Sequence, residues 1–237
     1  MGSEKMEYVL VLCALKEEYE ALINKVQAGE PATIGGVAGT VFPIPSGLAF
    51  AFTGYVGKVG TAFILGKIAS CCKVKAIINS GVAGSLSDEA TPLTVVFADK
   101  VAFHDVDLTA FNLPYGMMDE QPLWFEAGKE FREAAKDLQS QRELQIKIGS
   151  MISGDSFVTK KNMPEKMIEY FGHPLAVDME GATVGMVANL LHVPFAVIRS
   201  ISDDTRKEGN RMNYEEFVEL AAKHASSVTL WLLNSIK

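Results

Sequence analysis

The stretch VDMEGATVGMVANLLHVPFAVIRSISDD, residues 177–204, decides the fold, because it predicts a helix that leads directly into a buried strand. In the predicted helix, Glu180 lies on the same face as Val184 and Val187, at spacings of four and seven residues. The run at 193–198 is almost continuously apolar, which is typical of a parallel strand covered on both faces. A helix and a buried strand in this order indicate an α/β fold.

Three charged side chains in this stretch are candidates for a functional site. Glu180 needs a partner, because burying a lone carboxylate costs free energy. Arg199 and Asp203 are expected at the carboxyl end of the strand, where ligands bind in open α/β sheets. A structural ion pair between a buried Glu and a strand-end Arg explains the same pattern, and this stretch alone does not decide between the two interpretations.

Length and composition limit the classes of protein that fit. The chain has 237 residues, of which 48% are hydrophobic, and we expect one domain over 1–237, with 1–6 as a disordered or added start. A net charge of −7 argues against nucleic acid as a partner. No apolar run approaches the roughly 18 residues that cross a bilayer, so no membrane partner is expected. Cys13, Cys71 and Cys72 cannot all pair, which favours a cytoplasmic location.

The rest of the chain alternates predicted strands and helices. Strands are predicted at 7–12, 33–37, 39–44, 48–53, 74–79, 92–103 and 146–152. Helices are predicted at 17–26, 61–70, 125–141, 161–171 and from 213 or 214 to about 236. The inner face of the last helix is predicted to carry Leu220, Ala221, Val228 and Leu232. This order predicts a single three-layer α/β/α domain around a central mixed sheet.

The glycine-rich and charged loops lack the residues that a cofactor or a metal ion requires. The glycines between Gly54 and Gly60 lack the G-x-G element of a dinucleotide site, and the segment from Ser80 to Gly84 lacks the lysine of a P-loop. The His and two Asp at 104–107 are not accompanied by further ligands at helical spacing. We therefore expect no cofactor and no metal ion.

The turn after the first predicted strand carries Glu17 and Glu18 at the place where a phosphate-binding loop would carry glycines. Two carboxylates make this turn unsuitable for a phosphate. Acids in the first turn of a helix also complement its dipole, and that structural explanation stays open for this turn taken alone.

Six motifs are decisive when they are taken together. In chain order they are ALKEE at 14–18, NSGVAG at 79–84, HDVDLTAF at 104–111, SGDSF at 153–157, DMEGA at 178–182 and RSISD at 199–203. They resemble the 5′-methylthioadenosine/S-adenosylhomocysteine nucleosidases, within the purine nucleoside phosphorylase superfamily. The resemblance covers about residues 8 to 236. It implies a nucleoside phosphorylase-like fold and hydrolysis of the N-glycosidic bond of these two nucleosides in methionine salvage, releasing adenine without a cofactor.

The resemblance also implies roles for four charged residues. Asp203 matches the general acid that protonates N7 of the purine, and such an acid needs a raised pKa. Glu18 matches the carboxylate that activates water, and Arg199 matches a residue that organises the Glu18 side. Glu180 matches the carboxylate that binds the ribose hydroxyls. The expected transition state resembles an oxocarbenium ion, which nearby carboxylates stabilise.

The remaining expected contacts to the substrate come from apolar residues and main chain. Met179 is expected against the sugar, Phe157 against the base, and the backbone at Val158 at the purine edge. The other expected contacts are Val56, Val82, Ala83, Gly84 and Asp178. The resemblance places Phe111 and Leu113 in the 5′ pocket of the neighbouring subunit, which implies a homodimer.

Several residues depart from the pattern of the family. Val82 replaces a small hydroxyl residue, Asp178 replaces the commoner Glu, and Leu113 replaces an aromatic residue. The segment that follows Asp203 carries three cations, Arg206, Lys207 and Arg211. They are expected either in a solvated loop or in contact with a carboxylate on a larger 5′ substituent, and the preferred 5′ substituent stays open.

Three alternatives remain. A futalosine or aminofutalosine hydrolase would share the fold and the carboxylates. A phosphate-dependent phosphorylase is disfavoured, because Glu18 would repel phosphate. A non-catalytic nucleoside-binding relative is disfavoured because Glu18, Glu180 and Asp203 are all present, although fold alone would not imply activity.

Overall fold

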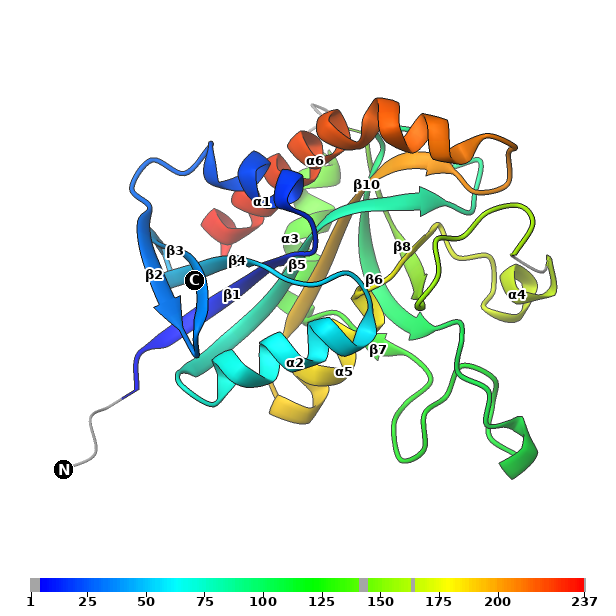
Figure 1. Cartoon of the computed structure of the whole chain (residues 1–237), viewed down its shortest axis with the longest axis horizontal. Helices are drawn as coiled ribbons and strands as arrows, with labels where there is room; N and C mark the ends of the chain where they lie inside the picture. The colour runs from blue at the N-terminus through cyan, green and yellow to red at the C-terminus, as the bar shows by residue number, and fades with distance from the viewer. Residues whose placement is uncertain (1–4, 141–144, 163–164, 237) are drawn as a thin grey trace.

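The computed structural model describes residues 5–140, 145–162 and 165–236. Ten strands in these residues form one mixed sheet (Figure 1). They are β1 (Glu7–Cys13), β2 (Glu30–Ile34), β3 (Val37–Ile44), β4 (Gly47–Thr53), β5 (Lys73–Ser85), β6 (Val95–Phe103), β7 (Phe125–Glu126), β8 (Ile146–Ser153), β9 (Ala176–Asp178) and β10 (Phe195–Asp204). Of the expected disordered start, residues 1–4 lie outside the described residues.

The α-helices cover both faces of this sheet. They are α1 (Lys16–Ile23), α2 (Lys58–Ala69), α3 (Lys129–Ser140), α4 (Glu165–Tyr170), α5 (Gly181–Leu191) and α6 (Asn210–Ser235). Helices α1, α3 and α6 lie on one face, and α2 and α5 lie on the other (Figure 1). The predicted three-layer arrangement around a mixed sheet is therefore confirmed. In the described part of the chain, none of these helices is both long and apolar enough to span a membrane.

The strands pair in the order β10-β6-β8-β9-β5-β1-β4-β3-β2, and β10 also pairs with β5. This additional pairing closes five strands, β5, β10, β6, β8 and β9, into a ring. The pairs β1–β4, β1–β5, β5–β10 and β6–β8 are parallel, whereas β6–β10 and the β2–β3–β4 arm are antiparallel. The ring was not predicted, because the local sequence pattern of a strand does not reveal which other strands it pairs with.

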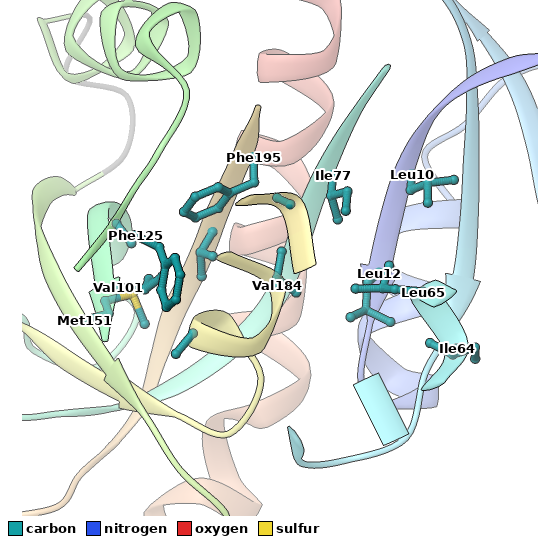
Figure 2. Close-up of a cluster of buried hydrophobic side chains, with 14 of the residues drawn as sticks. Leu10, Leu12, Ile64, Leu65, Ile77, Val101, Phe125, Met151, Val184 and Phe195 are labelled. Carbon is teal, nitrogen blue, oxygen red and sulfur yellow. The ribbon is translucent and has the colours of Figure 1, made fainter. Parts of the chain in front are cut away.

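Alternation along β1 separates two apolar cores. Leu10 and Leu12 point to the α2 and α5 side, whereas Val9 and Val11 point to the α1, α3 and α6 side, as the two-residue period of a strand requires. Figure 2 shows the first core, which includes Leu12 of β1, Leu65 of α2, Ile77 of β5 and Val184 of α5. Because helices cover both faces, the central strands consist of nearly continuous apolar runs.

Two strands are longer than predicted, and this changes where candidate residues lie. Strand β5 continues through the predicted loop at 80–84, because these residues keep pairing with β10 as far as Ser85. Strand β10 continues to Asp204, so Arg199 lies in its interior rather than at its end, and only Asp203 is near the carboxyl terminus. The prediction that Arg199 lies at the carboxyl end of the strand was therefore wrong, because β10 continues beyond it to Asp204.

Helix α5 begins one residue after Glu180, which occupies the N-cap position instead of the predicted apolar stripe. The reason is local, since the carboxylate of Asp178 accepts hydrogen bonds from the backbone N–H of Gly181 (3.0 and 3.2 Å) and fixes the first turn there. Glu180 is thereby free to point toward the neighbouring loops.

Three other predictions were wrong in detail. Phe125 belongs to β7 rather than to the predicted helix, because it pairs with Val101 of β6 and packs edge-on against Phe103. Leu220 is 44% exposed, whereas Ala221, Val228 and Leu232 are buried as predicted. Leu220 lies about 100° around α6 from Ala221, outside the stripe that packs on the sheet. The helix predicted at 161–171 is shorter, and its positions 163–164 lie outside the described residues.

A matched pair of leucines tests the packing of the helices. Leu65 of α2 is fully buried, so we expect Leu65→Ala to lower the free energy of unfolding by about 2–5 kcal/mol. Leu220→Ala in α6 should change it by less than about 0.5 kcal/mol. Urea unfolding followed by circular dichroism measures both values, and equal losses for the two variants would contradict the assigned faces.

Candidate active site

A buried guanidinium lies at the centre of the candidate site. Arg199 is 1% exposed and lies in β10. Its Nε donates to Oδ2 of Asp178 (2.8 Å), and its Nη2 donates to Oε2 of Glu180 (3.0 Å) and to Oδ1 of Asn79 (2.6 Å). Its Nη1 lies 3.9 Å from Oε1 of Glu18. One cation is thus shared by three buried carboxylates, and Arg199 together with these three groups would carry a net charge of −2 if all were ionised.

Glu18 is held by main-chain donors at the start of α1. Its Oε2 accepts from the N–H of Leu15 (3.0 Å), and its Oε1 accepts from the N–H of Val82 in β5 (2.9 Å). Burial raises the pKa of Glu18 above its ordinary value, against the opposing effects of Arg199 and these N–H groups. The side chain is therefore fixed in place, and its carboxylate is a stronger proton acceptor than that of an ordinary Glu.

Gly81 lets this arrangement form. A Cβ at this position in β5 would overlap the guanidinium of Arg199 and the carboxylate of Glu18. Only a residue without a side chain allows both groups to approach the strand at this point.

Glu180 connects Arg199 to the loop before α2. Its Oε1 accepts from the N–H of Gly57 (2.8 Å), and its Oε2 accepts from Arg199. Burial raises the pKa of Glu180 to about 7, and the neighbouring Asp178 and Glu18 act in the same direction, against Arg199. With two carboxyl pKa values raised, the cluster retains a proton close to neutral pH.

Asp178 lies in β9 and has its oxygens engaged within the protein. Oδ1 accepts from the hydroxyl of Ser153, Oδ2 accepts from Arg199, and both accept from the N–H of Gly181. These contacts orient Arg199 and the start of α5. A direct contact of Asp178 with a sugar, as expected from the sequence, stays a prediction.

Asp203 lies near the end of β10 and is almost fully buried. The hydroxyl of Ser202 is 2.9 Å from its Oδ1 and 3.2 Å from the carbonyl oxygen of Ala83. Gly84 lies beside it, so the backbone of β5 approaches the carboxyl group closely.

These groups border a cavity with a volume of about 220 Å³. Most of the site residues predicted from the sequence line this cavity. They are Glu18, Val56, Val82, Ala83, Gly84, Phe157, Val158, Asp178, Met179, Glu180 and Asp203. Arg199 is not among the lining residues and lies behind the carboxylates. Predicted residues from six separate segments therefore meet at one place.

Phe111 and Leu113 lie elsewhere. Phe111 belongs to a short 3₁₀ helix (Thr109–Phe111) and is 75% exposed. Both residues, together with Leu108 and Asp119, border a second cavity. Glu18, Glu180 and Asp203 do not line it. Within this chain they do not reach the first cavity.

The sequence analysis did not identify seven other residues that line the first cavity. They are Ala14, Leu15, Ser156, Val177, Ser202, Thr205 and Tyr214. Six of them lie within or beside the six motifs and follow from adjacency. Tyr214 carries no such signal, since it comes from α6 and packs edge-on against Phe157, with 5.7 Å between ring centroids. Burial and the nearby carboxylates, Glu18 first, raise the pKa of Tyr214 to about 12, so its phenol stays neutral.

The basic segment after Asp203 is engaged with carboxylates of its own. Arg206 contacts Asp204 and Asp88, both at 2.9 Å. Lys207 lies 3.3 Å from Asp204, and Arg211 lies 3.1 Å from Glu215. None of the three cations lines the cavity. The structure therefore fits the solvated loop better than a contact with the substrate.

Comparisons with known proteins show which family this chain resembles in sequence and in fold. The sequence matches the phosphorylase superfamily over residues 8–234. It is 30% identical to the 5′-methylthioadenosine/S-adenosylhomocysteine nucleosidase of Bacillus thuringiensis, over 97% of this chain and 99% of the relative.

Two solved structures are similar along almost their whole length. The nucleosidase of the same name from Streptococcus pneumoniae, solved with a transition-state inhibitor, is 32% identical with a TM-score of 0.90, covering 98% of this chain and 100% of that one. The futalosine hydrolase of Helicobacter pylori is 27% identical with a TM-score of 0.88, covering 98% of each chain.

The raised pKa of Glu180 predicts a pH dependence of stability. The folded state binds a proton more tightly than the unfolded state, so this stabilising contribution is present below about pH 4.5 and is lost as the pH rises toward 7. One such group changes the free energy of unfolding by at most about 1.4 kcal/mol per pH unit. We expect Glu180→Gln to flatten the decline of the melting temperature between pH 4.5 and 7. Parallel pH profiles for the two proteins would contradict this assignment.

Proposed function

Because this chain belongs to the phosphorylase superfamily, and within it to the 5′-methylthioadenosine/S-adenosylhomocysteine nucleosidases, we propose that it hydrolyses the N-glycosidic bond of these two adenine nucleosides. The observation that carries the proposal is the meeting of Glu18 from α1 with Asp203 from β10 at one cavity. Two carboxyl groups on different elements provide the acid and the base that glycoside hydrolysis needs.

In the proposed reaction, Asp203 donates a proton to N7 of the purine while the bond between C1′ and N9 breaks. Adenine then leaves as a neutral base, and positive charge develops on the ribose ring. Glu18 accepts a proton from the water that adds to C1′, which completes hydrolysis. The carboxylates around Arg199 stabilise the developing charge, because the site excludes most of the solvent that would screen them.

The surroundings of Glu18 support water rather than phosphate as the nucleophile. The N–H groups of Leu15 and Val82 point to the place where an anion would bind, but both donate to the carboxylate of Glu18. A phosphate dianion would meet this carboxylate and Glu180 with no free main-chain donor from these two residues. Electrostatic repulsion between the phosphate and these two carboxylates therefore disfavours a phosphorylase.

The remaining lining residues fit the parts of a nucleoside. Glu180 is proposed to accept hydrogen bonds from the ribose hydroxyls, with Met179 against the sugar. Phe157 is proposed to stack on the base, and the main chain at Val158 to contact the purine edge. Val56, Val82, Ala83, Gly84 and Asp178 complete the wall around the substrate.

A homodimer is proposed to complete the 5′ end of the pocket. Val59 and Phe63, one turn apart on α2, are 80% and 60% exposed, and Tyr55 beside the cavity residue Val56 is 62% exposed. Phe111, in the 3₁₀ helix, is a fourth large apolar side chain that is exposed to solvent, and exposed apolar surface is typical of an interface between proteins when it is contiguous. A second copy of the chain would cover this surface and could supply Phe111 and Leu113. We also propose that the protein is a cytoplasmic enzyme of methionine salvage.

Release of adenine tests the proposed reaction. We expect purified protein to release adenine from methylthioadenosine and adenosylhomocysteine in the absence of phosphate. Asp203→Asn and Glu18→Gln should each lower kcat by about 100-fold or more, because each removes a proton-transfer group. A liquid-chromatography assay of adenine measures this.

Three outcomes would change the assignment. Release from aminofutalosine alone would move the enzyme to the futalosine hydrolases, whose Helicobacter pylori representative shares this fold. Turnover that requires phosphate would contradict the role of Glu18. Binding of adenine without any turnover would indicate a non-catalytic relative.

Substitution on α2 tests the dimer. We expect the wild-type protein to sediment as a dimer and Phe63→Glu to shift it toward the monomer, because a charge would be buried against an apolar surface. The KM for methylthioadenosine should rise in the variant, since the 5′ pocket would lose its second wall. A monomeric wild-type protein in analytical ultracentrifugation would refute the shared pocket.

A further inference from the structure

A cluster of three charged residues joins three loops beside the cavity without lining it. Lys58 begins α2, Asp105 follows β6 and Asp155 follows β8. The Nζ of Lys58 donates to Oδ2 of Asp105 (2.6 Å) and lies 4.0 Å from Oδ2 of Asp155. The backbone N–H of Lys58 donates to Oδ1 of Asp155 (2.7 Å), and the backbone N–H of Asp155 donates to Oδ2 of Asp105 (2.9 Å).

These contacts differ from an ordinary surface ion pair, which contributes little to stability. Two of the four contacts are made by main-chain N–H groups, so the cluster fixes the backbone of the loops and not only the side chains. Gly57 adapts to this geometry with a φ of 90°, and a Cβ there would run into Oδ1 of Asp155. The stem of Lys58 also places its ammonium group 5.7 Å from the ring centroid of Phe103.

The neighbours of the cluster are the residues proposed to hold the two halves of the substrate. Asp155 lies two residues before Phe157, which is proposed to stack on the base. Lys58 follows Gly57, whose N–H holds Glu180 on the ribose side, and lies two residues after Val56. The cluster therefore connects the base side of the cavity to the ribose side.

We propose that Lys58, Asp105 and Asp155 form a clamp of positioning residues, which holds the loop at 54–57 and the loop at 153–158 at the separation that the nucleoside requires. This inference rests on the proposed function for its substrate, although the clamp itself is a property of the free protein. Although burial of Asp105 acts in the opposite direction, its hydrogen bond to Lys58 holds the pKa of Asp105 below the ordinary value, which favours the ionised carboxylate in this contact.

The position of the clamp predicts how its loss affects the kinetics. None of the three side chains lines the cavity, so none touches the reacting atoms. Without the clamp, the two loops adopt the binding-competent separation in a smaller fraction of the molecules, and the apparent affinity falls by that fraction. The chemical step in the bound complex is unchanged, so KM rises while kcat is maintained.

Lys58→Met is the informative variant, because methionine keeps an apolar stem over Phe103 and removes the charge. For methylthioadenosine we expect its KM to rise about 10-fold and its kcat to change by less than about 2-fold. Lys58→Arg should restore most of the affinity. Asp105→Asn should raise KM similarly, and the effect of the double variant should be smaller than the sum of the two single effects, since both substitutions remove the Lys58–Asp105 ion pair. Lys147→Met, which removes an exposed ion pair with Glu89, serves as the control.

Hydrogen exchange tests the clamp without the enzymatic assay. In Lys58→Met, the amides of residues 54–58 and 153–158 should exchange at least several-fold faster than in the wild type, with no change in β1. Unchanged exchange and unchanged KM would overturn the clamp, as would a loss confined to kcat. A wild type that hydrolyses no adenine nucleoside would refute the proposed function, whereas the exchange experiment would still decide the clamp. Sedimentation of each variant controls for a change in oligomeric state.

Discussion

The buried guanidinium of Arg199 is the constraint on which the rest of the site depends. A cation this far from solvent requires several acceptors, and Asn79, Asp178, Glu180 and Glu18 provide them from three segments of the chain. Satisfying Arg199 therefore brings together the middle of β5, the turn from β9 to α5 and the start of α1. The same contacts place two carboxyl groups with raised pKa values at the edge of a cavity. In this protein, the structural ion pairs of Arg199 belong to the candidate site, so the two interpretations do not exclude each other.

Much of this arrangement is predictable from the sequence. The buried strand after residue 193 and the helix before it follow from hydrophobic periodicity, and the motifs carry Glu18, Glu180 and Asp203 in recognisable contexts. Periodicity determines which face of an element is buried, and this explains why Ala221, Val228 and Leu232 were placed correctly on α6. The likeness to a known family supplied what periodicity cannot, namely which strand ends meet.

The failures have a common physical origin in contacts that hydrophobic periodicity does not encode. Glu180 lies at an N-cap because Asp178 takes the N–H of Gly181, and Phe125 forms a strand because β6 offers it a partner. Strand β5 extends to Ser85 only because β10 runs beside it. Tyr214 lines the cavity beside Phe157, against which it packs edge-on. The cap of α5 depends on a specific side-chain contact, and the other outcomes depend on neighbours distant in sequence. Local propensity carries no information about either kind of contact.

The two hydrogen bonds that Glu18 accepts have an evolutionary consequence. The backbone at Leu15 and Val82 already presents converging N–H donors, and a single side chain masks them. A shorter or neutral residue at position 18 would expose both donors on an otherwise unaltered scaffold, which is the beginning of an anion-binding site. In the proposed mechanism, the choice between water and an oxyanion as the attacking group on this backbone therefore depends largely on the residue at position 18. Descent from a common ancestor could alter that choice without redesigning the fold.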